Sequence, residues 1–181
     1  MGAEKATLRL GGIPLLEIAT RKALALTQEV HVVGARAKFG EDAIEDVFPG
    51  QGPLGGIHAA LCSTSTEMNL VLAVDVPFVP VEFLRFLRRR AESCSALVVV
   101  PRSRHGWQPL CAIYRQGFRE AAEQALKAAD NKIDMLFARV AIQIIDEQEV
   151  QDAGFSPAIF DNLNTPEELA RAQTRLRKEQ S

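Results

Sequence analysis

Short runs of β-branched and aliphatic residues recur along the chain and alternate with longer amphipathic stretches. The run at 69–74 is apolar on both faces, which is typical of a strand buried within a sheet. Other runs are rich in Val and Ile, a composition that favours strands. The pattern therefore predicts strands at 30–33, 69–74, 96–100, 112–114 and 141–145, of which 112–114 has the shortest pattern.

The stretches between these runs place apolar residues at helical spacing. Between Pro14 and Thr27 the apolar side chains fall roughly on one face, and Pro14 suits a first helical turn. Near the end of the chain, Thr165, Pro166 and Glu168 form a helix start signal with a capping box. Helices are accordingly predicted at 14–27, 56–63, 80–93, 116–129 and 133–139, and after Thr165.

Strands separated by helices indicate βαβ units. The sequence thus predicts an α/β fold with a mainly parallel sheet and helices on both faces. A length of 181 residues suits one domain spanning 1–181. In such sheets ligands bind beyond the carboxyl ends of the strands. The segments directly after each strand are therefore the first places to search for function.

Composition narrows the class of protein. Apolar residues make up 47% and charged residues 24%, which is typical of a globular chain and not of a disordered one. The net charge of −2 argues against a general electrostatic attraction to nucleic acid. The longest apolar stretch, 68–81, is too short and too interrupted to span a membrane. Three widely spaced cysteines and the lack of a leader pattern after Met1 predict a protein of the reducing cytoplasm.

Asp75 is the first candidate for a functional residue. It comes directly after the buried run at 69–74, and Pro77 then ends the strand. A carboxylate at the carboxyl end of a sheet is a suitable oxygen ligand for Mg²⁺ that carries nucleotide phosphates. The alternative is that Asp75 caps the helix that begins near Pro80.

Two further segments carry candidate binding groups. Gly-Gln-Gly-Pro-Leu-Gly-Gly at 50–56 allows a ligand to approach the backbone closely, although a flexible connecting loop has the same composition. Asn162 and Asn164 alternate on a short extended segment, so they face the same way and either reach one ligand or stabilise the turn. Taken alone, Lys5 belongs to a solvated amino terminus.

Taken together and in this order, the motifs resemble those of the molybdenum cofactor guanylyltransferases. The resemblance covers essentially the whole chain and rests on short motifs whose combination is specific. The matching motifs are Met1-Gly2-x-x-Lys5-x-x-Leu8-x-Leu10, Gly12-Ile13-Pro14-Leu15-Leu16, Gly52-Pro53-Leu54-Gly55-Gly56-Ile57, Val74-Asp75-Val76-Pro77-Phe78, Gln108-Pro109-Leu110-Cys111-Ala112-Ile113-Tyr114 and Asn162-Leu163-Asn164-Thr165-Pro166-Glu167-Glu168-Leu169.

The resemblance implies a Rossmann-like nucleotidyltransferase fold and an enzyme of molybdenum cofactor biosynthesis. Such an enzyme transfers GMP from GTP to molybdopterin-bound molybdenum and releases pyrophosphate. The implied partners are GTP, the molybdopterin cofactor and the proteins that insert molybdenum or receive the product, with neither nucleic acid nor membrane. Motif by motif, the implied site consists of Lys5 on the nucleotide phosphates, Asp46, Gly52, Pro53, Leu54 and Gly55 along the nucleotide, Asp75 on Mg²⁺, and Asn162 and Asn164 on the acceptor side.

One departure from the family pattern stands out. Members of the family begin with an apolar strand and a loop of the form Leu-Ala-Gly-Gly-x-Ser-x-Arg, placed before the Met-Gly with which this sequence starts. That strand normally lies inside the sheet, so its loss would leave unpaired backbone groups at a buried position. We expect a start of translation further upstream; a truncated sequence and a degenerate relative are the alternatives.

Two other functions remain open at this point. The first is a cytidylyltransferase of the same cofactor, whose relatives tend to carry Asp in place of Asn162 and Asn164. The second is a nucleotide-binding protein without catalysis, because the phosphate-binding loop is missing from the sequence.

Overall fold

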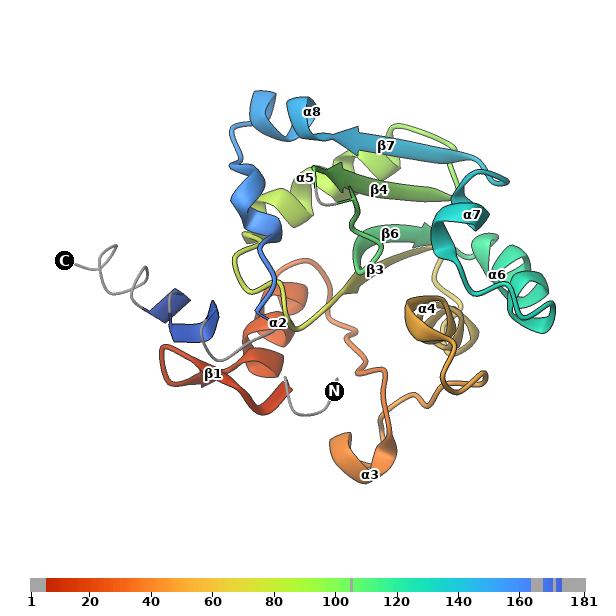
Figure 1. The fold of residues 1–181 in the computed structure, drawn as a ribbon, viewed down its shortest axis with the longest axis horizontal. Helices are drawn as coiled ribbons and strands as arrows, with labels where there is room; N and C mark the ends of the chain where they lie inside the picture. The colour runs from red at the N-terminus through yellow and green to blue at the C-terminus, as the bar shows by residue number, and fades with distance from the viewer. Residues whose placement is uncertain (1–5, 105, 164–167, 171, 174–181) are drawn as a thin grey trace.

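A computed structural model describes residues 6–104, 106–163, 168–170 and 172–173 (Figure 1). Helices cover a central sheet, and a small hairpin packs beside α2 at the amino-terminal side. The elements in chain order are β1 (Arg9–Leu10), β2 (Ile13–Pro14), α2 (Leu15–Leu24), α3 (Arg36–Phe39), α4 (Gly52–Cys62), β3 (Met68–Leu72), α5 (Val81–Glu92), β4 (Val98–Ser103), β5 (Gly106–Trp107), β6 (Cys111–Arg115), α6 (Phe118–Lys127), α7 (Ile133–Phe137), β7 (Ile142–Asp146), α8 (Glu147–Asp152) and the 3₁₀ helix η1 (Pro157–Phe160).

The sheet is richer in antiparallel pairs than the sequence predicted. β6 lies between β3 and β4 and is antiparallel to both, and β5 is antiparallel to β4. Only β4 and β7 pair in parallel within the described sheet. The prediction of a mainly parallel sheet is therefore wrong for strand pairing. The physical reason is the short connection from β4 to β6, which has no room for the crossover that a parallel pair requires.

Helices do cover both faces of the sheet, as predicted. Successive residues of β4 show this directly, because Val98 and Val100 pack into one hydrophobic cluster while Val99 packs into the other. The first cluster includes residues of α4 and α6, and the second includes residues of α5 and α8. A sheet between two apolar layers explains why its strands read as nearly continuous apolar runs.

The predicted strand at 30–33 does not join the sheet. Its pairing consists of one isolated parallel bridge between Val33 and Ile44. The Ile44 N–H donates to Val32 O at 2.9 Å, and the Gly34 N–H donates to Ile44 O at 2.8 Å. A strand needs a neighbouring ladder as well as an apolar sequence, and this segment has no ladder among the described residues.

Several boundaries also differ from the predictions. α2 begins one residue after Pro14, which pairs with Arg9 in a two-residue hairpin closed by Gly11 and Gly12. Both glycines have positive φ, 59° and 83°, as a type I′ turn requires. α8 and η1 were not predicted. The predicted start of the last helix at Thr165 and Pro166 lies outside the described residues.

No helix within the described parts of the chain is long and apolar enough to cross a membrane.

The buried thiol of Cys111 makes the stability of the fold depend on pH in the alkaline range. Burial raises its pKa from 9.0 to about 12, so the folded state keeps a proton that the unfolded chain loses first. This contribution to stability is complete below pH 9 and is lost as the pH rises toward 12. The lowered pKa of Lys22 acts in the opposite sense, and the raised pKa of Tyr114 adds to the loss.

We expect Cys111→Ala to make the alkaline loss of stability shallower, by up to about 1.4 kcal/mol per pH unit. Urea unfolding of both proteins at several pH values between neutrality and pH 11 measures this. Cys94→Ala is the matched control for removing a thiol, because Cys94 is only partly buried whereas Cys111 is buried. Equal slopes in wild type and Cys111→Ala would contradict the assignment.

Candidate functional site

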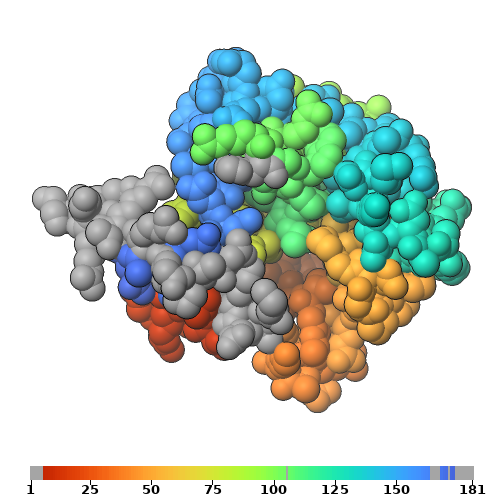
Figure 2. Space-filling model, viewed as in Figure 1, coloured from red at the N-terminus to blue at the C-terminus, as the bar shows by residue number. Residues whose placement is uncertain are grey.

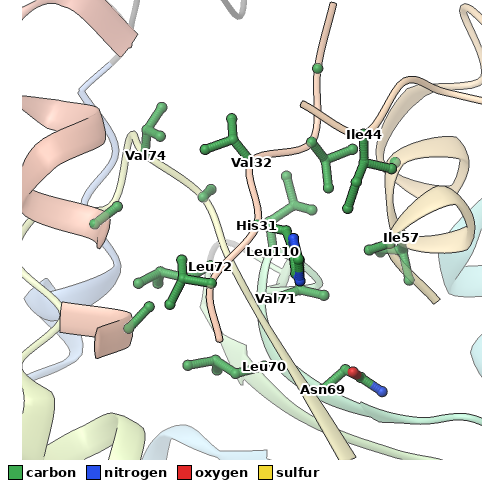
Figure 3. Close-up of a pocket in the computed structure, with 18 of the residues that line it drawn as sticks. His31, Val32, Ile44, Ile57, Asn69, Leu70, Val71, Leu72, Val74 and Leu110 are labelled. Carbon is green, nitrogen blue, oxygen red and sulfur yellow. The ribbon is translucent and has the colours of Figure 1, made fainter. Parts of the chain in front are cut away.

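A cavity of about 820 Å³ lies beside β3, between α2 and α4 (Figure 3). Its walls are mostly aliphatic side chains and glycines, drawn from α2, the segment 30–35, α4 and the segment 68–75. Four of the residues that the sequence singled out are among its lining residues, namely Asp46, Gly52, Pro53 and Asp75. Tertiary folding therefore brings together groups from two distant segments.

Asp75 sits in a turn that several contacts hold in place. The turn follows β3 directly, and Val76 and Val79 behind it are buried. Lys22 of α2 reaches this turn, where its Nζ donates to Pro77 O at 2.5 Å and to Val79 O at 2.7 Å. Burial lowers the pKa of Lys22. The ammonium group thus joins α2 to the turn that carries Asp75.

The segment with Asn162 lies against the same turn. The Leu163 N–H donates to Asp75 O at 2.9 Å, and the Leu163 side chain is buried beside Leu10 and Leu15. Asn162 itself is exposed. The structure therefore brings the segment with Asn162 next to the turn with Asp75, although Asn162 is not among the residues that line the cavity. Lys5 and Asn164, the other two residues predicted for the site, lie outside the described residues.

The carboxylate of Asp46 has a hydrogen-bond acceptor without a partner among the described residues. Its Oδ1 atom is buried and has no hydrogen-bond partner among the described residues. The carboxyl group faces the first turns of α4, because a Cβ added at Gly56 would lie 3.7 Å from Oδ1. Burial raises the pKa of Asp46, while the nearby His58 lowers it. A buried acceptor of this kind is stabilised by any ligand that brings an N–H or O–H donor.

Most of the glycine-rich segment belongs to a helix, which begins four residues before the predicted start at 56. α4 begins at Gly52, which has a φ of 64°, and Pro53 occupies its first turn. Leu54 is fully buried in the hydrophobic core, and Gly55 is buried beside it. Gly52 and Pro53 therefore face the cavity, whereas the Leu54 side chain points away from it. The predicted start was late because Pro53 and Leu54 among four glycines do not reveal where a helix begins.

Gly55 and Gly56 provide a matched pair for testing this packing. A Cβ at Gly55 would lie 3.1 Å from the backbone oxygen of Phe48, whereas one at Gly56 meets atoms only at 3.7 Å. We expect Gly55→Ala to lower the free energy of unfolding by about 1–3 kcal/mol. Gly56→Ala should be neutral or stabilising by up to about 1 kcal/mol, because alanine favours a helix interior. Urea unfolding measures both, and equal effects would contradict the close approach of Phe48.

Lys22 is a site residue that the sequence analysis missed. A signal was present, because the spacing of Leu15, Ile18, Lys22 and Leu26 puts the lysine on the apolar face of its helix. A charged residue on such a face needs partners inside the protein. The backbone oxygens of the turn after β3 are those partners.

Two carboxylates of the cavity, Asp46 and Asp75, are candidate ligands for Mg²⁺. The described residues hold no group of three or more His, Cys, Asp or Glu side chains that could bind a metal ion by themselves. Mg²⁺ in nucleotide enzymes commonly uses one or two carboxylates together with substrate phosphates and water. Asp75 and the unpartnered oxygen of Asp46 are hard oxygen donors on one cavity, so the residues present fit a metal that arrives with a nucleotide.

Comparisons with known proteins show the family to which this chain belongs. The family model described as MobA-like NTP transferase domain matches residues 1–144. A relative from Pelotomaculum thermopropionicum, named probable molybdenum cofactor guanylyltransferase, is 32% identical over 96% of this chain and 85% of that protein. Ninety-three curated proteins match this chain significantly, and seven others among them carry the same name.

Solved structures extend the comparison to the fold. The crystal structure of molybdopterin-guanine dinucleotide biosynthesis protein A from Archaeoglobus fulgidus has a TM-score of 0.83 and 27% identity, over 97% of this chain and 91% of that chain. A 2-C-methyl-D-erythritol 4-phosphate cytidylyltransferase from Thermus thermophilus has a TM-score of 0.68 at 20% identity, over 97% and 95%, and shows the fold alone. This chain therefore has an α/β nucleotidyltransferase-like fold and belongs to the family of MobA-like NTP transferase domains.

Proposed function

We propose that this protein transfers GMP from GTP to the terminal phosphate of molybdenum-loaded molybdopterin, forming the guanine dinucleotide of the cofactor and pyrophosphate. The observation that carries the proposal is the shared cavity of Asp46, the start of α4 and Asp75, in a chain that belongs to a nucleotidyltransferase family. Relatives that are 32% identical and named probable molybdenum cofactor guanylyltransferase support the choice of substrates.

In the proposed reaction an oxygen of the acceptor phosphate attacks the α-phosphorus of GTP. A new P–O bond forms there while the bond from the α-phosphorus to the bridging oxygen of the β-phosphate breaks. The electron pair of that bond leaves on pyrophosphate. The acceptor phosphate is already ionised at neutral pH, so no side chain has to remove a proton. The protein has to align the two phosphates and offset their charge.

Each site residue has a proposed part in this alignment. Asp75 would hold Mg²⁺, which supplies positive charge next to the nucleotide phosphates when it is bound. Asp46 would accept a hydrogen bond from a donor group of the nucleotide, which satisfies its buried oxygen. Gly52 and Pro53 would let the nucleotide lie close to the backbone. The remaining assignments are Leu54 and Gly55 as support for that turn, Lys5 on the phosphates, and Asn162 and Asn164 on the acceptor.

We also propose that the reaction takes place in the cytoplasm. The three cysteines are free, which fits a reducing compartment. The protein partners would be those that insert molybdenum into the cofactor and those that receive the dinucleotide.

The test is pyrophosphate release with Mg²⁺ and molybdenum-loaded molybdopterin, with GTP and CTP compared side by side. It is run on this chain and on a form extended upstream in its reading frame. Release with GTP and not with CTP is the expected result. Release with CTP alone would move the protein to cytidylyl transfer. Tight GTP binding without release in both folded forms would replace catalysis with a nucleotide-binding role.

A further inference from the structure

A second pocket, of about 430 Å³, lies between α5 and the end of α8. It shares no lining residue with the cavity described above. Figure 2 shows the molecular surface hollowed between the orange segment with α3 and the sheet above it, where the first cavity lies. α8 contacts β7, whereas the first cavity lies beside β3, at the other end of the strand order (Figure 1). The lining residues of this second pocket, the α5–α8 pocket, are Glu82, Arg85, Phe86, Arg89, Ala153 and Phe155.

The periodicity of α5 builds one wall of the pocket. Its four lining residues lie at positions i, i+3, i+4 and i+7 counted from Glu82, so they share one side of the helix. Leu84 and Leu87 are fully buried and pack in the core on another side. The same helix therefore anchors itself in the core and presents a mixed aromatic and charged stripe at the surface.

The end of α8 builds the opposite wall. The Gly154 N–H donates to Gln151 O at 2.8 Å, and the Phe155 N–H donates to Val150 O at 3.0 Å. Gly154 has a φ of 86°, which glycine adopts without strain. These bonds form a Schellman motif, which ends the helix and turns the chain back. The motif thereby places Phe155 against α5.

The floor of the pocket is aromatic and well supported. The rings of Phe86 and Phe155 lie 6.1 Å apart between centroids, and both are partly exposed. Phe83 is fully buried and contacts both rings, at 5.8 and 5.2 Å. An ion pair of 2.7 Å between Arg90 and Glu149 also joins α5 to α8. The two exposed rings therefore form a fixed apolar surface.

Two arginines at this pocket lack a strong partner. Arg89 is exposed and has no ion pair among the described residues. The Nη1 atom of Arg85 lies 3.7 Å from Oε1 of Glu82, and both side chains are more than half exposed. An exposed pair at this distance contributes little, so another carboxylate can replace Glu82 at small cost. With one carboxylate against two guanidinium groups, the lining carries a net positive charge.

Other charged groups close by are already engaged. The Nε atom of Arg88 donates to Oε1 of Glu92 at 2.9 Å, and Arg88 does not line the pocket. Asp152 precedes Ala153 in the chain, accepts from the Gln148 side chain at 2.8 Å and is not a lining residue. The uncompensated positive charge therefore lies directly beside the aromatic floor.

We propose that the α5–α8 pocket binds a segment of another protein that carries an acidic residue beside a large apolar side chain. The apolar side chain packs on Phe86 and Phe155, and the carboxylate pairs with Arg85 and Arg89. None of the six lining residues is buried, whereas small-molecule sites enclose their ligands and orient them with converging polar groups. Aromatic residues and arginine are the types enriched at protein interfaces and at their most energetic positions. The proposal does not depend on the proposed reaction.

The test selects peptides of about seven residues from a random library displayed on phage, with the full chain as bait. A parallel selection uses Ala153→Glu, which introduces a carboxylate at an exposed position of the pocket. The most enriched peptide is synthesised, and fluorescence anisotropy measures its Kd for wild type, Arg85→Gln, Arg89→Gln and Arg88→Gln. Arg88→Gln is the matched control, because it removes the same charge from the same helix outside the pocket. Circular dichroism and the Tm verify that all variants are folded.

We expect the selected peptides to combine Asp or Glu with Leu, Ile or Phe, and Ala153→Glu to select none of them. Arg85→Gln and Arg89→Gln should each raise the Kd by about fivefold or more, and Arg88→Gln by less than about twofold. Selection without acidic residues, no enrichment at all, or a Kd that the two pocket variants leave unchanged would overturn the proposal. A dimer in sedimentation that Ala153→Glu dissociates would also overturn it, in favour of a second copy of this chain.

Discussion

Replacing Asp75 with asparagine is expected to lower pyrophosphate release from GTP by about 10²–10³-fold at fixed Mg²⁺. The amide keeps the size of the side chain and loses the negative charge that the proposed function assigns to the metal. The backbone bond from the Leu163 N–H to Asp75 O does not involve the side chain, so the turn itself should persist. Steady-state release over a series of Mg²⁺ concentrations measures the effect.

The matched control is Asp42→Asn. Asp42 is exposed and is not among the residues that line the cavity, so its loss of charge should leave the rate unchanged. Circular dichroism and the unfolding midpoint should be the same for both variants and wild type. Transfer by Asp75→Asn at the wild-type rate, with the wild-type Mg²⁺ dependence, would show that Asp75 does not hold the metal.

The second large effect is on stability. Phe83→Ala is expected to lower the free energy of unfolding by about 3–5 kcal/mol, because it leaves a cavity in a tightly packed region. Phe83 is fully buried in α5 and meets Phe155 and Phe160 edge to face, at centroid distances of 5.2 and 5.3 Å. Urea unfolding followed by circular dichroism measures the loss. For a chain of this size the Tm should fall by about 2–4 °C for each kcal/mol.

Phe86→Ala provides the comparison within the same helix. Phe86 is only partly buried against the same cluster, so its truncation should cost clearly less, about 1–2 kcal/mol. Equal losses for the two variants would mean that the ring contacts of Phe83 are not the source of the effect. The Phe83 cluster also includes Val79 behind the Asp75 turn and Phe160 before Asn162. We therefore expect nucleotide transfer by Phe83→Ala to be more sensitive to temperature than transfer by Phe86→Ala.

Local sequence patterns predicted most of the elements. The periodic stretches at 80–93 and 116–129 contain α5 and α6, and the apolar runs at 69–74 and 141–145 overlap β3 and β7. The periodicity of a segment reflects which of its faces are buried, and that information is local. The same patterns predicted helices on both faces of the sheet, and the position of Asp75 directly after a buried strand.

Local patterns did not predict which strands pair or in which direction. The run at 112–114 looks alike whether the strand is parallel or antiparallel, and only the short connection from β4 hints at the reversal. The run at 30–33 is as apolar as a buried strand, yet its pairing is limited to the bridge at Val33. Apolar composition predicts burial, while a strand also requires a partner from elsewhere in the chain.

The sequence by itself determined the α/β class, the two apolar layers and the placement of Asp75 at the end of a strand, because each follows from the order of residues within one segment. Only the tertiary structure decided that Asp46 and Asp75 share a cavity, that Lys22 holds the turn after β3, and that α5 and the end of α8 form a second pocket. These features depend on contacts between segments far apart in the chain. Their geometry is set by how the helices pack on the sheet, which no single segment encodes.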